Sequence, residues 1–227
     1  MTQTVDWTAR SARIDALQVE VCFLLNDTFY RGDENSHAQL HDPAFRVPLP
    51  LPAFPRALPL LARSSEVSGH EHELAAYYRR IVDQAAALGK PFNAIGHYFW
   101  LRLWLWQEGG AAFSYPWYDT LGEMHPLLDW LQAPSADAPY RDIEQGWDFD
   151  ALRIGETIHL RQGDSDSGEE HVNVALPAGA LAPAAAQAQK RAAESIAALA
   201  LGLGADVWTG RLPHARFGTA TWQPGTR

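Results

Sequence analysis

The feature that most constrains the fold is a series of three strand-like segments joined by short turns: Trp147–Arg153, Thr157–Gln162 and His171–Leu176. Apolar and polar residues alternate within them, which is the two-residue period of a β-strand. Gly155-Glu156 predicts a tight turn after the first segment, and the polar loop Gly163–Gly168 precedes the third. Because turns this short join antiparallel neighbours, the three segments predict an antiparallel meander.

A second hairpin is predicted earlier in the chain. Two sets of side chains alternate along residues 98–107, and both are largely apolar, which predicts a strand covered on both faces. Gly109-Gly110 provides a turn, and residues 111–115 return as a second strand that ends before Pro116.

Three segments carry apolar residues with a helical period: 68–89, 119–131 and 183–203. In the first, Ser68 and Glu71 match a capping box, and Gly89 matches the residue that follows a helix. Pro126 indicates a kink in the second segment or its division into two short helices, and Pro183 is expected to open the third. The sequence therefore predicts an α+β fold, an antiparallel sheet of about five strands with helices packed on one side, in a single domain spanning 1–227.

The least certain stretch is residues 8–31, where the apolar residues fit both a strand period and a helical stripe. A helix is favoured, because about 20 residues without a turn signal is long for one strand.

Six prolines between positions 43 and 59 exclude a helix interior or a central strand there. We expect this extended segment to be a connector whose Leu49, Leu51 and Phe54 cover apolar surface. Docking of the segment into an aromatic groove is the alternative interpretation.

Composition excludes several classes of function. A net charge of −9 makes a nucleic-acid partner a poor fit, because phosphate contacts need clustered Lys and Arg. The longest apolar run, Tyr98–Trp106, is far shorter than the ~20 residues of a membrane helix. The first residues lack the basic and apolar regions of a signal peptide, and Cys22 is the single cysteine, so we expect a cytoplasmic protein without a disulfide framework.

Segments that resemble reactive or metal-binding motifs have simpler interpretations. His70 and His72 stand about 200° apart around a helix, so a helix cannot aim both at one metal ion. The loop 163–170 lacks the spacing of a calcium-binding loop and the partners of a nucleophilic serine, so we expect a solvated hairpin loop. Cys22 lies in an apolar run and is expected to be an inert core thiol. No catalytic residue, metal ligand or cofactor is assigned.

Charge is distributed unevenly along the chain. The segment from Asp119 to Glu170 holds 13 acids and 3 cations, a net charge of −10. Such a surface attracts a basic partner, although surface acids also serve solubility, and both interpretations stay open. The candidate partner-binding residues are Asp142, Glu144, Asp148, Asp150, Asp164, Asp166, Glu169 and Glu170.

The first hypothesis is a cytoplasmic protein-binding module that recognises a basic protein through an acidic face of the sheet, on which several of these acids should lie together. Its most concrete form is a bacterial immunity or antitoxin-like protein that neutralises a basic toxin. It predicts no nucleic-acid or membrane partner and leans against an enzyme.

The alternatives use other residues. A metal-assisted hydrolase or small-ligand binder would draw on His70, His72, His97, His125 and neighbouring acids. A ligand pocket lined by tryptophans would use Trp100, Trp104, Trp106 and Trp117. Packing in the core of the sheet explains the presence of these tryptophans equally well.

Overall fold

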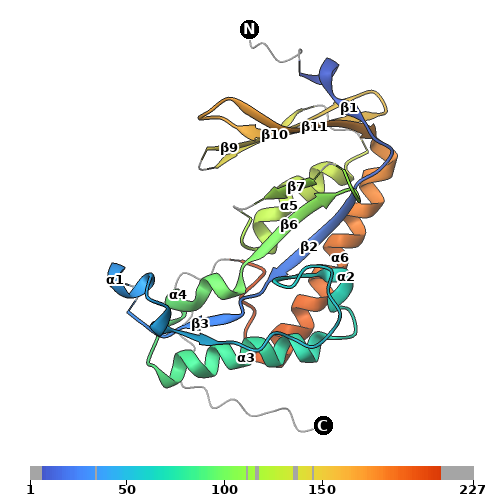
Figure 1. The fold of residues 1–227 in the computed structure, drawn as a ribbon. Coiled ribbons are helices and arrows are strands. Elements are labelled where there is room, and N and C mark those ends of the chain that lie inside the picture. The colour runs from blue at the N-terminus through green and yellow to red at the C-terminus, as the bar shows by residue number, and fades with distance from the viewer. Residues whose placement is uncertain are drawn as a thin grey trace. The chain divides into compact units, whose positions relative to one another are not determined.

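The computed structural model describes residues 7–33, 35–110, 112–115, 118–134, 138–144 and 146–210 and confirms an α+β fold (Figure 1). The chain divides into two compact units. The first comprises Met1–Val21, Leu103–Tyr118 and Glu123–Lys190, and the second comprises Cys22–Arg102, Asp119–Gly122 and Arg191–Arg227. The organisation as a single domain stays a prediction.

Four elements have residues in both units. They are the strands β2 (Gln18–Leu24) and β6 (Leu101–Trp106) and the helices α5 (Leu121–Gln132) and α6 (Ala178–Leu203).

The first unit contains a five-stranded sheet in the order β1-β11-β10-β9-β8. Its strands are β1 (Ala12–Arg13), β8 (Tyr140–Glu144), β9 (Trp147–Ile154), β10 (Thr157–Asp164) and β11 (Glu169–Pro177). The predicted meander is β9-β10-β11, and β8 extends it by one antiparallel strand that the sequence did not reveal. The short β1 pairs with β11 in parallel.

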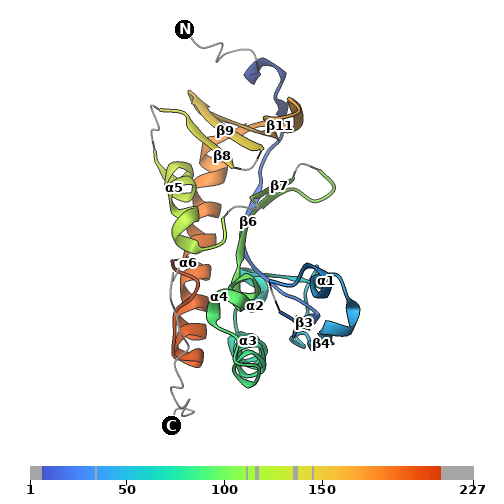
Figure 2. The same ribbon diagram turned by 90° about the vertical axis from the view of Figure 1, so that its left-hand side faces the viewer.

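One face of this sheet forms the core of the first unit. Its side chains are fully or almost fully buried: Phe149, Ala151, Ile158, Leu160, Val174 and Leu176. Strand β7 (Ala112–Tyr115), which pairs with β6 as predicted, packs Phe113 and Tyr115 against Phe149. Gln132 of α5 donates to Gln189 of α6 at 2.6 Å, and the two helices lie on the same side of the sheet (Figure 2). The two long helices of this unit thus lie on one side of the sheet, as predicted.

The opposite face of the sheet carries residues 7–11, which include the short helix η1 (Thr8–Arg10) (Figure 1). Trp7 is buried there, with its ring 6.2 Å from that of His159 and 5.3 Å from the guanidinium of Arg161. Ser11 bonds to His159 and to Asn173 at 3.0 and 2.7 Å. This face is therefore polar and only partly covered by the described chain.

The second unit holds the remaining elements. Its helices are α1 (His37–Leu40), η2 (Pro43–Phe45), α2 (Ser64–Val67), α3 (Glu71–Ala87), α4 (Phe92–Ile95) and η3 (Gly96–Phe99). Its strands are β3 (Thr28–Tyr30), which pairs with β4 (Arg46–Pro48), and β5 (Leu61–Arg63), which pairs with the end of β2. An aromatic cluster of Phe23, Tyr78, Phe99 and Trp208, with ring centroids 5.0–6.4 Å apart, fills its core.

The prediction of a helix over residues 8–31 is wrong. This stretch forms η1, β1, β2 and β3 instead. Five consecutive residues of β2, from Val19 to Phe23, are buried, so both faces of the strand are covered. A strand buried on both faces gives a continuous apolar run, which periodicity alone does not distinguish from a buried helix.

The three predicted helices exist, but their ends differ. Ser68 follows the separate short helix α2, and α3 begins at Glu71 with His70 as its N-cap, so the predicted capping box of Ser68 and Glu71 does not form. The Glu71 carboxylate accepts instead from Gly69 N–H at 3.1 Å. Gly89, at φ +66°, follows α3 as predicted. Both Pro126 and Pro183 lie inside single helices, each in the second turn, rather than opening or splitting one.

The proline-rich segment is irregular chain apart from η2 and β4. Of the three apolar side chains expected to cover apolar surface, Leu49 and Phe54 are buried and Leu51 is half-buried. Its role as a connector stays a prediction.

Candidate protein-binding site

Two hairpin turns meet at one end of the five-stranded sheet. The β8–β9 turn and the β10–β11 turn are joined by Ser165, whose N–H and hydroxyl both donate to the carbonyl of Gly146, at 2.7 and 3.2 Å. Gly146 has φ +88°, and a Cβ there would stand 2.9 Å from the carboxylate of Asp166. A residue without a side chain therefore lets the two turns come together.

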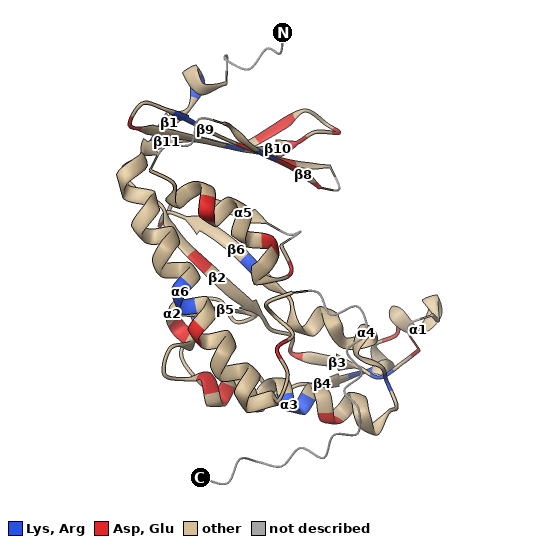
Figure 3. Cartoon of the chain, turned by 180° about the vertical axis from the view of Figure 1, so that it is seen from behind, with Lys and Arg blue, Asp and Glu red and all other residues tan. Residues whose placement is uncertain are grey.

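We call this region the acidic hairpin end and define it by Glu144, Trp147, Asp164, Asp166, Glu169 and Glu170. Acidic segments mark these strands and turns (Figure 3). A cavity of about 270 Å³ opens beside them, and its charged lining residues include Asp148, Asp164, Glu169, Glu170, Arg141 and Arg161. Five of the eight predicted acids thus belong to one end of the sheet, and a sixth, Asp148, lines its cavity.

Asp164 organises the β10–β11 turn. Its carboxylate accepts from the N–H groups of Asp166 and Ser167 at 2.8 and 3.0 Å, and its carbonyl accepts from Gly168 N–H at 2.8 Å. The bonds from the backbone of Ser167 and Asp166 lower the pKa of Asp164, because they stabilise the ionised form. The turn is a solvated hairpin loop, as predicted, and it keeps its carboxylate charged.

Trp147 is the residue of this region that the charge pattern did not single out. It pairs with Glu144 on β8 and with Asp164 on β10, so an acid flanks it on each neighbouring strand. Its exposed fraction is 39%, which is unusual for a tryptophan, and its ring lies 5.4 Å from that of His171. The sequence signal was its place directly after Gly146, next to a turn.

Asp148 and Asp150 lie on the polar face of the sheet, where cations surround them. Arg161 bonds to Asp150 and approaches Asp148 to 3.9 Å, and Arg141 approaches Asp150 to 3.5 Å. Both acids are mostly buried, with side chains 16% and 17% exposed. Their charge is therefore largely neutralised within the sheet, and they offer less to a partner than the acids at the turns.

Asp142 lies on the other face of the sheet, in register with the buried Phe149. Tyr118 donates to its carboxylate at 2.5 Å, and Tyr140 donates to it at 3.4 Å. Burial raises the pKa of both phenols, that of Tyr140 to about 12, so both stay protonated donors. The eight predicted acids do not share a single face, because β8 and β9 point Asp142 and Asp150 to opposite sides.

Glu169 and Glu170 begin β11. Glu169 has the more exposed side chain, at 69%, while Glu170 accepts from Asn173 at 3.2 Å and lies 3.6 Å from Arg10. Glu169 is thus the more available of the two for a partner.

The alternative sites find less support. Among the described residues, no group of three or more His, Cys, Asp and Glu side chains could hold a metal ion. His70 bonds to Glu73 at 2.9 Å, and Cys22 is buried, as expected for a core thiol.

The pocket lined by tryptophans stays a prediction. Trp104 and Trp106 stack on each other in the first unit with centroids 5.2 Å apart, Trp100 belongs to the second unit, and Trp117 lies outside the described residues.

Comparison with protein-family models, curated proteins and solved structures found no match. None of the helices in the described part of the chain is both long and apolar enough to cross a membrane.

Proposed function

We propose that this chain is a protein-binding module that recognises a basic protein through the acidic hairpin end. The observation that carries the proposal is the exposed Trp147 between Glu144 and Asp164. A partner's Lys or Arg placed over the indole would gain a cation–π contact and a carboxylate on either side. Exposed aromatic anchors are also the residues that most often dominate binding energy.

The surrounding acids add long-range attraction. Asp166 and Glu169 are exposed, and Asp164 is held in its charged form by backbone N–H groups. A concentration of one sign of charge raises the rate of encounter with an oppositely charged partner and repels other anions. The specific form of the proposal is an immunity protein of the bacterial cytoplasm that blocks a basic toxin.

A growth assay tests this form. The open reading frame adjacent to this gene is expressed alone and together with this chain. The proposal predicts that the neighbour arrests growth and that co-expression restores it. A harmless neighbour, or no rescue, contradicts the immunity form.

A matched pair of triple variants tests the surface. The first carries Glu144→Lys, Asp166→Lys and Glu169→Lys, and the second carries Asp15→Lys, Asp129→Lys and Glu156→Lys, which are exposed acids of the same unit outside the acidic hairpin end. Both change the net charge equally. Rescue should be lost only in the first, and equal rescue by the two variants contradicts the assignment of the surface.

A further inference from the structure

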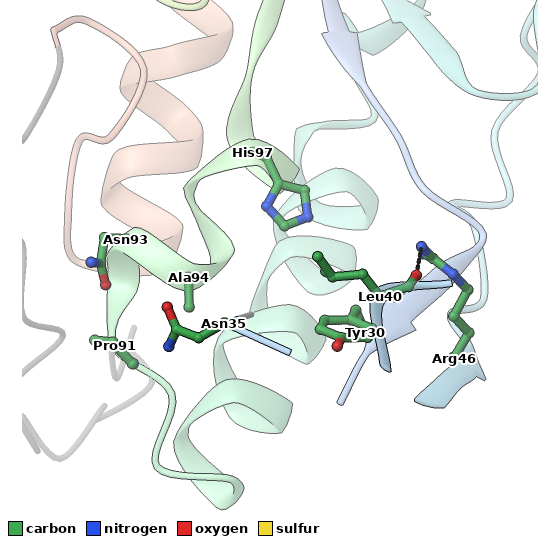
Figure 4. Close-up of a pocket in the computed structure, with 8 residues that line it drawn as sticks. All are labelled: Tyr30, Asn35, Leu40, Arg46, Pro91, Asn93, Ala94 and His97. Carbon is green, nitrogen blue, oxygen red and sulfur yellow. Dashed lines mark hydrogen bonds between the residues drawn. The ribbon is translucent and has the colours of Figure 1, made fainter. Parts of the chain in front are cut away.

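The second unit contains a larger cavity that the proposed function does not use. Its volume is about 510 Å³, within the range of about 300–1,000 Å³ typical of small-molecule sites. Its walls include Tyr30 and Arg46 from the β3–β4 hairpin, Asn35 and Leu40 from the chain between those strands, and Asn93 and His97 from the α4–η3 segment (Figure 4).

The described lining of this cavity contains one cationic side chain, that of Arg46. None of the lining residues that the structure describes is acidic, although the protein has a net charge of −9. The guanidinium of Arg46 lies 5.7 Å from the centre of the Tyr30 ring, and the ammonium of Lys90 lies 5.2 Å from it. The nearby carboxylate of Asp33 accepts from the backbone and side chain of Asn35. Two cations beside one wall favour an anionic ligand.

The walls also suit a flat ligand body. The aromatic Tyr30 and the imidazole of His97 lie on either side of Leu40, and these groups provide planar and apolar contact (Figure 4). The amides of Asn35 and Asn93 each offer both a donor and an acceptor. Arg46 donates one N–H to the carbonyl of Leu40 at 3.3 Å, which holds the guanidinium beside the backbone of Leu40.

We propose that this cavity binds a small organic anion, with the anionic group on Arg46 and a flat body between His97, Leu40 and the two asparagines. Mononucleotides and aromatic carboxylates share this chemistry. The site is independent of the acidic hairpin end, because every residue in it belongs to the second unit.

Isothermal titration calorimetry on the full chain tests the proposal with paired probes. Adenosine 5′-monophosphate is compared with adenosine, 4-hydroxybenzoate with 4-hydroxybenzamide, and inorganic phosphate is titrated alone. The proposal predicts that at least one anion binds and that its neutral counterpart binds about tenfold or more weakly. Which pair responds distinguishes a nucleotide from a carboxylate. The proposal is overturned if neither anion binds, if a neutral probe binds as well as its anion, or if inorganic phosphate binds as tightly as either anion.

Two variants locate the site. Arg46→Gln should weaken binding of the responding anion about tenfold or more, whereas Arg80→Gln, an exposed arginine on α3 outside the cavity, should leave it unchanged. Urea unfolding of both variants checks that each remains folded. Binding by folded Arg46→Gln at the wild-type affinity contradicts the proposed position of the anion.

Discussion

Replacing Gly146 with alanine tests how the two turns of the acidic hairpin end are joined. The backbone at this position has φ +88°, where a residue with a side chain costs about 1–3 kcal/mol. The lower entropy of alanine in the unfolded chain offsets about 0.4–1 kcal/mol of this. The new methyl group would also stand 2.9 Å from the Asp166 carboxylate, which can rotate away because it ends a flexible side chain. We therefore expect Gly146→Ala to lower the free energy of unfolding by about 1–2 kcal/mol.

Urea unfolding followed by circular dichroism measures this loss, with Gly155→Ala as the matched control. Gly155 occupies the β9–β10 turn at φ +57°, and a Cβ there meets no atom within 4 Å. Its substitution should cost less, about 0–1 kcal/mol, because the left-handed region is milder and no contact is made. Adding Asp166→Ala to Gly146→Ala should recover only the part of the loss caused by the contact. The account of the joined turns is refuted if Gly146→Ala and Gly155→Ala lose equal stability and the added Asp166→Ala recovers none of the loss.

The remaining predictions concern single side chains of the sheet. Trp147→Ala should weaken binding of a basic partner about tenfold, measured by calorimetry, without changing the urea midpoint; unchanged affinity contradicts its role as an anchor. Arg161→Gln leaves the mostly buried carboxylates of Asp148 and Asp150 without their main cation and should lower the free energy of unfolding by about 1–2 kcal/mol. A loss near zero would contradict this and mean that solvent screens the two charges. Asp164 has a lowered pKa in the folded state, so its stabilisation is complete above the ordinary value of 3.8 and is lost as pH falls through the lower folded value. The NMR signals of the Asp166 and Ser167 N–H groups, which donate to this carboxylate, should shift in that acid range in the wild type. A shift that persists in Asp164→Ala contradicts this assignment.

Local signals in the sequence located most of the first unit's sheet. Alternation and turn residues predict β9, β10 and β11, because these strands are neighbours in sequence and their turns are short. Strand β2 was not predicted, because its apolar residues fit a helical stripe as well as a strand period, and its partner β5 comes about 40 residues later. Long-range pairing of this kind leaves no local signal.

The candidate site was predicted in its composition but not in its geometry. Alternation within β9 places Asp148 and Asp150 on one face, but the face of Asp142 depends on the register between β8 and β9. The neutralising position of Arg161 depends in the same way on the register between β9 and β10. Acids at turns were easier to interpret, since a turn at the end of a hairpin is exposed in any register.

The most direct test of the protein-binding proposal is the association rate with the product of the adjacent reading frame, measured by stopped flow at several salt concentrations. The triple variant of the acidic hairpin end should associate about tenfold or more slowly than the wild type at low salt, with a weaker dependence on salt. The matched triple variant with lysines elsewhere on the unit should stay close to the wild type. Equal rates and equal salt dependence for the two variants would contradict the proposal that this end of the sheet meets the partner.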